Sequence, residues 1–195
     1  MLSFGCRASI VPAKCRSHAR ASFSSAISVA TDDESPRRKC SPIYVAATKQ
    51  HVGKTSVSLA LMSGLQKRFP DRVGFIKPVG QKSLSVKEDG SDIQVNADKD
   101  AVLIKRHFNL HRQSYRQSSP LLIPSGYTRD YLDGINNCSS AHQNALIQQA
   151  FDAIDAMSDV VLCEGTGHVA VGSIVDACNA DVAAMLGASI VLVTN

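Results

Sequence analysis

The sequence lacks several patterns that would place it in a particular class of protein. Its six cysteines form no Cys-x-x-Cys pair and have no histidines at metal-ligand spacing, which argues against a disulfide framework and a structural zinc site. No apolar run approaches the roughly 20 residues of a membrane-spanning helix. The net charge is only +4, and much of it lies in the amino-terminal tail. We therefore expect neither nucleic acid nor a membrane as a partner.

Acidic residues are absent from the amino-terminal segment before Asp32. The same segment carries Arg7, Lys14, Arg16 and Arg20 and is rich in serine, a composition typical of an organellar transit peptide. We therefore assign residues 1–42 to a transit peptide and a polar linker, with a plastid or a mitochondrion as the destination. The alternative is a basic tail that has no targeting function, on a cytoplasmic protein.

Residues 43–195 show apolar, β-branched runs that alternate with helical patterns, and the stretch is long enough for one domain with its own core. Nearly all-apolar strands between helices indicate an α/β fold, in which a parallel sheet is covered by helices on both faces. A segment rich in Ser, Pro, Gly, Asn and Tyr predicts a long loop over 111–140. The expected strands are 43–47, 73–77, 159–165 and 188–195, and the expected helices are 53–69, 98–108, 141–157 and 174–187.

The stretch TKQHVGKT, which follows the first strand and opens the first helix, indicates a phosphate-binding loop (P-loop). Gly53 allows the backbone to approach a phosphate, and the N–H groups at the start of the helix attract an anion. Lys54 can bridge the β- and γ-phosphates, and the Thr55 hydroxyl can bind Mg²⁺. The first glycine of the usual motif is replaced by Thr48, which predicts a variant site with a wider loop. The candidate nucleotide-binding residues are Thr48, Val52, Gly53, Lys54, Thr55 and Ser56.

Two further strand ends carry charged side chains. Lys77 ends the second strand and Glu164 ends the third, and the carboxyl ends of parallel strands are where such sheets bind ligands. Glu164 is a candidate Mg²⁺ contact, and the glycines that follow it, Gly165 and Gly167, would let a substrate pass close to the backbone. Asp98 and Asp100 are alternatives for a further metal contact or for helix capping.

The segment 118–134 should lie over the substrate side of the site. Tyr127, Arg129 and Tyr131 could hold an anionic ligand there, and an ordered surface loop without a ligand is an equally good interpretation.

These motifs together resemble the dethiobiotin-synthetase-like P-loop family. The loop ATKQHVGKT corresponds to that family's G-T-x-x-x-V-G-K-T, with Ala47 in place of the leading glycine, and the family also lacks a glycine where Thr48 stands. KPV at 77–79 and EGTG at 164–167 match the family's next two motifs. The branch formed by the amino-terminal domains of phosphate acetyltransferases is the most similar, and the resemblance covers residues 43–195.

The resemblance implies that Lys54 and Thr55 bind ATP and Mg²⁺, with Asp100 and Glu164 as further Mg²⁺ contacts. It also implies that Lys77 lies near the substrate or the γ-phosphate, so that Lys54 and Lys77 are the candidate catalytic residues. Because the family continues with strands that hold adenine, we expect this chain to be truncated at its carboxyl end.

Three functions remain open at the level of sequence. The first is an ATP-dependent synthetase or ligase that acts on a small molecule. The second is a regulatory nucleotide-binding module without turnover. The third is a homodimeric switch ATPase similar to MinD and ParA, in which Lys49 would reach the partner subunit; Gln50 and His51 replace the two glycines of that group's motif.

Overall fold

A five-stranded sheet forms the centre of the molecule in the computed structural model, which describes residues 7–10, 40–135, 139–167 and 172–194. The strand order is β1-β9-β2-β8-β3. β2, β3, β8 and β9 run parallel, and β1 pairs antiparallel with β9. The strands are β1 (Arg7–Ile10), β2 (Ile43–Ala47), β3 (Val73–Ile76), β8 (Val160–Glu164) and β9 (Ser189–Thr194).

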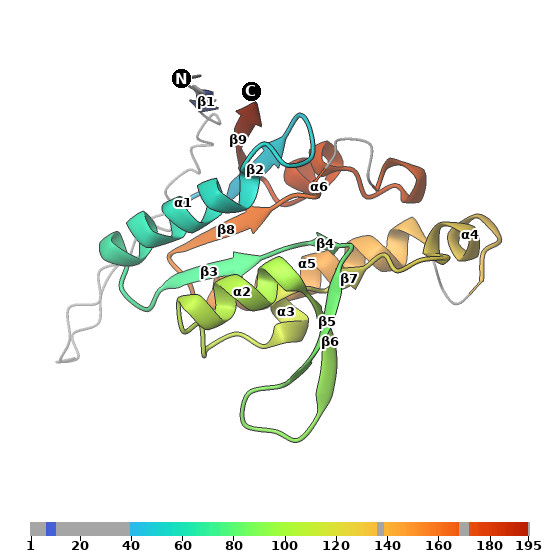
Figure 1. Ribbon diagram of the computed structural model, residues 1–195, viewed down its shortest axis with the longest axis horizontal. Coiled ribbons are helices and arrows are strands. Elements are labelled where there is room, and N and C mark those ends of the chain that lie inside the picture. Colours follow the sequence, from blue (N-terminus) through green and yellow to red (C-terminus); the bar gives the residue numbers. More distant parts are fainter. Residues whose placement is uncertain (1–6, 11–39, 136–138, 168–171, 195) are drawn as a thin grey trace, which may run out of the picture.

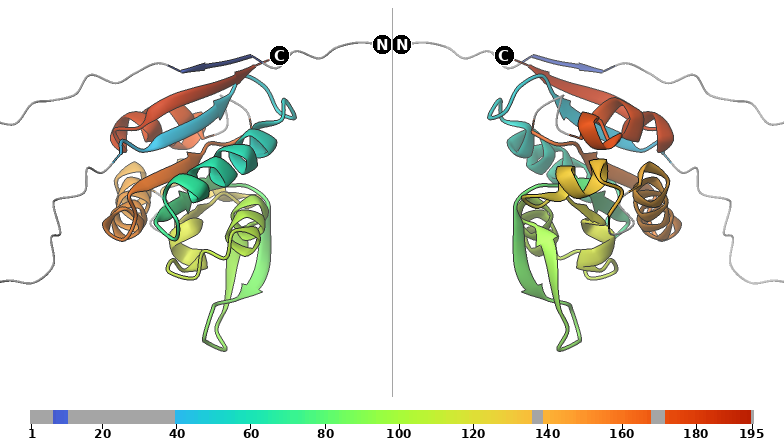
Figure 2. Two further views of the ribbon diagram at one scale, coloured as in Figure 1. Left: turned by 90° about the vertical axis from the view of Figure 1, so that its left-hand side faces the viewer. Right: turned by 90° about the vertical axis from the view of Figure 1, so that its right-hand side faces the viewer.

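Helices cover both faces of this sheet, as Figures 1 and 2 show. α1 (Lys54–Arg68) and α2 (Lys99–His107) pack on one face, where they meet Val45 and Ala47 of β2. α5 (Ser140–Ala156) and α6 (Asn179–Met185) cover the other face, where Tyr44 and Ala46 lie. Alternate side chains of one strand therefore belong to two different cores. The predicted α/β fold, with a parallel sheet between two layers of helices, is confirmed.

Two small sheets lie beside the central one. β5 (Ser83–Lys87) and β6 (Gln94–Asp98) form an antiparallel hairpin that projects from the body in Figure 1. β4 (Val79–Gly80) pairs in parallel with β7 (Leu121–Leu122). The hairpin is mostly polar and buries only a small cluster around Val86 and Val95. Its sequence has little of the apolar alternation that would predict its strands. Among the described helices, none is long and apolar enough to cross a bilayer.

The prediction of a loop over 111–140 is wrong in part. This segment contains α3 (Tyr115–Ser118), β7 and α4 (Tyr127–Leu132), and α5 begins at its end. α3 begins at a capping box, in which the Ser114 hydroxyl accepts from the Gln117 N–H and the Gln117 side chain accepts from the Ser114 N–H. These elements are too short to produce a periodic pattern.

The helix predicted over 174–187 begins later than expected. A 3₁₀ turn, η1 (Ser173–Val175), comes first, and the chain then breaks at Asp176, whose φ is 52°. α6 starts only after Cys178, whose side chain accepts from the Asp181 N–H. The left-handed backbone at Asp176 interrupts any continuous helix.

The sheet-facing side of α5 also differs from the predicted one. The apolar spacing of the sequence predicts a face containing Leu146, Ala150, Ile154 and Met157, but Leu146 and Met157 are only half-buried. The helix carries a broad apolar arc, so more than one stripe satisfies the helical period. The residues that it buries are Gln143, Ile147, Ala150, Phe151 and Ile154.

The outer edge of β3 is covered by a side chain. Gln113, which is buried, donates from Nε2 to the Phe75 carbonyl at 2.7 Å and accepts from the Phe75 N–H through Oε1 at 3.1 Å. The next outward-pointing N–H along this edge is that of Lys77, and it donates to the Ser118 carbonyl at 2.8 Å. The Phe75 backbone groups and the Lys77 N–H on this edge are therefore satisfied without another strand.

Candidate functional site

The loop between β2 and α1 has the backbone of a phosphate-binding loop. β2 ends at Ala47 and α1 begins at Lys54, so the loop joins a strand directly to a helix N-terminus. Gly53 has a φ of 92°, and a Cβ placed there would meet no atom within 4 Å. Glycine is therefore favoured at this position by its left-handed backbone, while the space beside it is open. The first N–H groups of α1 are available to an anion.

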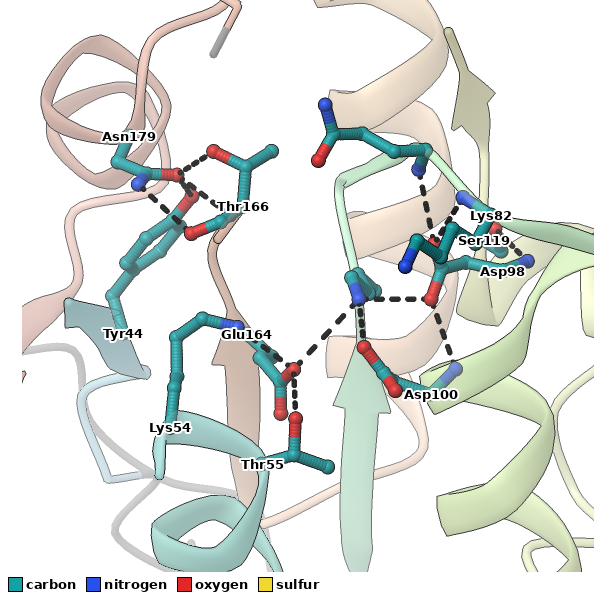
Figure 3. Close-up of polar contacts among 12 residues, drawn as sticks. Tyr44, Lys54, Thr55, Lys82, Asp98, Asp100, Ser119, Glu164, Thr166 and Asn179 are labelled. Atoms are coloured by element: carbon teal, nitrogen blue, oxygen red, sulfur yellow. Dashed lines mark hydrogen bonds and ion pairs between the residues drawn. The ribbon is translucent and has the colours of Figure 1, made fainter. Parts of the chain in front are cut away.

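Lys54, Lys77 and Glu164 converge at the carboxyl edge of the sheet, as predicted. β8 lies between β2 and β3, so its last residue stands between the loop and the end of β3. The Lys54 Nζ lies 3.0 Å from the Glu164 Oε1, and the Lys77 Nζ lies 3.8 Å from the same oxygen. The Thr55 hydroxyl donates to that oxygen at 3.3 Å, as Figure 3 shows.

Lys77 is a buried cation held by aspartates from the start of α2. Its Nζ lies 2.8 Å from the Asp98 Oδ1, and it also donates to the Asp100 Oδ2. Burial alone would lower the pKa of the Lys77 ammonium, but the charges of Asp98, Glu164 and Asp100 together raise it above its ordinary value. Lys77 is therefore charged at neutral pH.

The contact with Lys77 also shifts the pKa of Asp100. Burial alone would raise its pKa, but the charge and hydrogen bond of Lys77 outweigh this and hold the pKa below its ordinary value, with smaller contributions from Lys99 and Lys54. Asp100 is thus an ionised carboxylate at the cleft, where it could contact a metal ion.

Asp98 caps α2 and also binds the backbone at the base of the β5–β6 hairpin. Its Oδ1 accepts from the Asp100 N–H at 2.9 Å and so caps α2. Its Oδ2 accepts from the N–H groups of Gln81 at 3.0 Å and Lys82 at 3.3 Å, which fixes the base of the β5–β6 hairpin, as the right-hand part of Figure 3 shows. Of the two aspartates left open by the sequence, Asp98 has the capping role, while Asp100 keeps one carboxylate at the cleft.

Glu164 has an oxygen that fits a metal ion. Its side chain is fully buried, and its Oε2 has no hydrogen-bond partner among the described residues. A buried carboxylate oxygen without a partner is costly, and the Thr55 hydroxyl lies next to this carboxylate. No three His, Cys, Asp or Glu residues in the described part of the chain form a metal cluster. Mg²⁺ suits such a site, because it commonly uses one or two protein ligands together with phosphate oxygens and water.

Lys54, Thr55, Lys77, Asp98 and Asp100 line a cleft of about 350 Å³, which is within the usual range for a small-molecule site. Its walls carry five lysines and two aspartates, an excess of positive charge that suits a polyphosphate. The P-loop forms one wall, and the base of the hairpin, with Gln81 and Lys82, forms another. The lysines are Lys49, Lys54, Lys77, Lys82 and Lys99.

Sequence reasoning missed the second wall. Gln81, Lys82 and Lys99 received no role. For Gln81 and Lys82 the reason is that the hairpin itself was not predicted, whereas Lys99 lies in the helix predicted over 98–108. The signal that could have identified two of them is their position shortly after KPV at 77–79, which ends beside the P-loop.

The two glycines after Glu164 occupy different environments. Gly167 lines the cleft. A Cβ on Gly165 would lie 2.6 Å from the Asn179 Oδ1 and 2.8 Å from the Tyr44 Cε1, so glycine is required there by packing. The Asn179 Oδ1 accepts from the Tyr44 hydroxyl at 3.2 Å and from the Thr166 N–H at 2.9 Å, which ties the segment after β8 to α6 (Figure 3).

Tyr127 and Arg129 do not line this cleft. Both belong to α4, where Tyr127 is half-buried and packs against one of the cores. Arg129 is exposed and lies 3.8 Å from Asp133 on the same helix. Tyr131 donates to the Asp176 carboxylate at 2.6 Å. The structure therefore gives these side chains local partners, and their proposed contact with an anionic ligand stays a prediction. His168 comes directly after EGTG in the sequence, where it could contact a substrate or only a local backbone carbonyl, and it lies outside the described residues.

A comparison with protein families finds a match over the part of the chain that carries this site. The family model described as "AAA domain" matches residues 41–195, which include the P-loop, Lys77 and Glu164. No curated protein sequence matches the chain.

Proposed function

This chain belongs to the family described as "AAA domain", in the P-loop NTPase class, and from that premise we propose that it binds ATP together with Mg²⁺. The observation that carries this proposal is the group around Glu164. Its buried carboxylate contacts Lys54 and the Thr55 hydroxyl at the mouth of the P-loop, and its second oxygen has no partner among the described residues. A carboxylate, a hydroxyl and an ammonium group at a helix N-terminus are the groups that a magnesium–triphosphate complex needs.

Each group has a distinct task in this proposal. The N–H groups of Val52 to Thr55 and the side chain of Ser56 surround the phosphates, and Thr48 shapes the start of the loop. When the nucleotide binds, the Lys54 ammonium group leaves Glu164 and contacts phosphate oxygens. Thr55, Glu164 and Asp100 would hold Mg²⁺, which supplies charge neutralisation at the transferred phosphate. Lys77 points at the same place and stabilises negative charge that develops there.

For the reaction, we propose an ATP-dependent synthetase of the dethiobiotin-synthase type. In such a reaction ATP activates a small anion, and catalysis is mainly positioning and charge stabilisation. The cleft supports it through a buried, charged Lys77 beside the P-loop and through further lysines on the wall opposite.

One observation favours the alternative, a regulatory module that binds ATP without turnover. The substrate contacts predicted in α4 lie outside the cleft, and Lys77 is already neutralised by two aspartates. ATP turnover that requires diaminopelargonate and bicarbonate would support the synthetase. Tight ATP binding with negligible turnover in their presence would support the regulatory module.

Nucleotide binding itself is tested by Lys54→Ala. We expect calorimetry to show no measurable Mg-ATP binding, because the variant loses the ammonium group that contacts the phosphates. Lys67→Ala, in the exposed last turn of the same helix, is the matched control and should bind as the parent does. Unchanged Mg-ATP affinity in Lys54→Ala, with an unchanged thermal unfolding temperature, would refute the site.

We also propose that residues 1–42 direct the protein to a plastid or a mitochondrion. The basic, serine-rich composition without acids before Asp32 supports this. A fluorescent fusion of the full chain should enter an organelle, and deletion of residues 2–30 should leave it in the cytoplasm. A full-length fusion that stays in the cytoplasm would refute the proposal.

A further inference from the structure

A second cavity, of about 570 Å³, lies apart from the ATP cleft and shares no lining residue with it. It is bounded by β6, by the segment from α3 to β7, and by α5. The lining residues are Asn96, Arg116, Gln117, Ser119, Pro120, Leu122, Leu146, Gln149, Ala150 and Ala153.

One wall of this cavity is an apolar stripe of α5 at the margin of the core, where Ala150 is buried and Leu146 and Ala153 are half-buried. Leu146, Ala150 and Ala153 have the spacing of one helix face, and Leu146 is one of the two residues whose burial we predicted wrongly. Pro120 and Leu122 add further apolar surface. The cavity therefore offers an apolar patch that could bury a short hydrocarbon chain.

The polar side of the cavity has one charge, and that charge is positive. Arg116 is exposed and forms no ion pair with a carboxylate of the described residues, and no acidic side chain lines the cavity. Ser119 is only 4% exposed. Its hydroxyl accepts from the Asp98 N–H at 2.9 Å, and no described residue accepts its hydroxyl hydrogen. The cavity thus combines an unpaired guanidinium with a buried hydroxyl donor.

We infer that this cavity binds a small monocarboxylate with a short apolar tail. The guanidinium can pair with the carboxylate through two parallel hydrogen bonds, and the Ser119 hydroxyl can donate a further one. The tail lies against the α5 stripe. An amine of the same length is disfavoured, because Arg116 would repel it and no carboxylate in the lining would hold it.

The test uses the full chain, labelled with ¹⁵N and titrated with hexanoate. We expect saturable changes in the amide signals of Arg116, Ser119 and Leu146, and no saturable change with hexylammonium. Arg116→Gln should weaken hexanoate binding roughly tenfold through loss of the charge-assisted pair. Arg112→Gln makes the same charge change at an exposed arginine outside the cavity and should leave binding unchanged.

A second variant separates a cavity from simple attraction to an exposed arginine. Ala153→Phe fills the space while keeping Arg116, and it should abolish binding with an unchanged spectrum elsewhere. Absence of saturable changes with hexanoate, equal binding of hexylammonium, or full binding by Ala153→Phe would each overturn the inference.

Discussion

Glu164 is the residue that links the charges of the candidate ATP site. Its Oε1 contacts Lys54, Thr55 and Lys77, while its Oε2 has no partner in the described part of the chain. Two cations and a hydroxyl therefore depend on one buried carboxylate, and a change at this position should affect both metal binding and stability.

We predict that Glu164→Gln lowers the Mg²⁺ dependence of ATP binding, because the amide retains an oxygen but loses the charge that attracts the metal. Calorimetric titrations of ATP with and without Mg²⁺ measure this, and we expect the ratio of the two affinities to fall roughly tenfold or more. Affinity for ATP alone should not fall, since a negative charge near the phosphates is removed. An unaltered metal response would show that Glu164 does not contact Mg²⁺.

Asp100 should make the free energy of unfolding fall at acidic pH. Its folded-state pKa is held below its ordinary 3.8 by Lys77, so its stabilising effect is present above that value. The effect is lost as the pH falls through the lower folded-state pKa. Urea unfolding between about pH 5 and pH 2 should therefore show a shallower loss of stability in Asp100→Asn than in the parent. Identical pH profiles would contradict this account.

The titration of Lys77 should not change the free energy of unfolding near neutral pH. Its pKa is raised above the ordinary 10.5, so its stabilising effect is complete below that value and is lost only as the pH rises through the higher folded-state pKa. The contact between Lys77 and Asp100 should therefore contribute a constant amount to stability across the physiological range.

At the scale of elements, the start of α2 connects the site to the hairpin. Asp98 caps α2, contacts Lys77, and accepts hydrogen bonds from the base of β5. A helix of nine residues and a two-stranded hairpin are each marginal alone. Their shared aspartate joins them to the central sheet.

We expect Asp98→Ala to lower the free energy of unfolding by about 3 to 5 kcal/mol, because it removes one partner of a buried ion pair and a helix cap. Asp98→Asn should cost clearly less, since its side-chain oxygen can still cap the helix. Urea denaturation of the two variants beside the parent measures both values. Equal losses for alanine and asparagine would mean that the cap contributes little and the charge contributes nearly all.

A second element-scale prediction concerns the contact of β8 with α6. Gly165→Ala places a Cβ 2.6 Å from the Asn179 Oδ1, and overpacking of this kind costs about 1 to 3 kcal/mol. Gly167→Ala is the control, because its nearest neighbour is the Gln50 side chain at 3.3 Å, which can move. Thermal unfolding should therefore separate the two variants, and equal unfolding temperatures would contradict the packing role of Gly165.

Sequence reasoning found the elements that are long or fully buried. β2, β3, β8 and β9 are apolar runs, and the strand-to-helix context of TKQHVGKT placed the P-loop correctly. Because parallel strands end at one edge, Lys77 and Glu164 could also be placed beside that loop. The β5–β6 hairpin could not be found, because its strands are largely exposed and polar, and the face of α5 was ambiguous because its apolar arc is broad. Contacts such as Asp98 with Gln81 depend on tertiary structure alone.

At the scale of the whole molecule, the position of Lys49 bears on the third function considered, the dimeric switch. Lys49 is exposed and lines the cleft of its own chain. We therefore predict that Mg-ATP does not change the molar mass measured by light scattering, and that Lys49→Ala has the same mass as the parent. ATP-dependent dimerisation that is lost in Lys49→Ala would instead support the dimeric ATPase.

The side chain of Gln113 also has a consequence for assembly. It satisfies the Phe75 N–H and carbonyl on the outer edge of β3, the groups that an incoming strand would need. On that flank an incoming strand would find the Phe75 backbone groups already occupied, and Gln113→Ala would free those two groups while the Lys77 N–H stays bound to the Ser118 carbonyl.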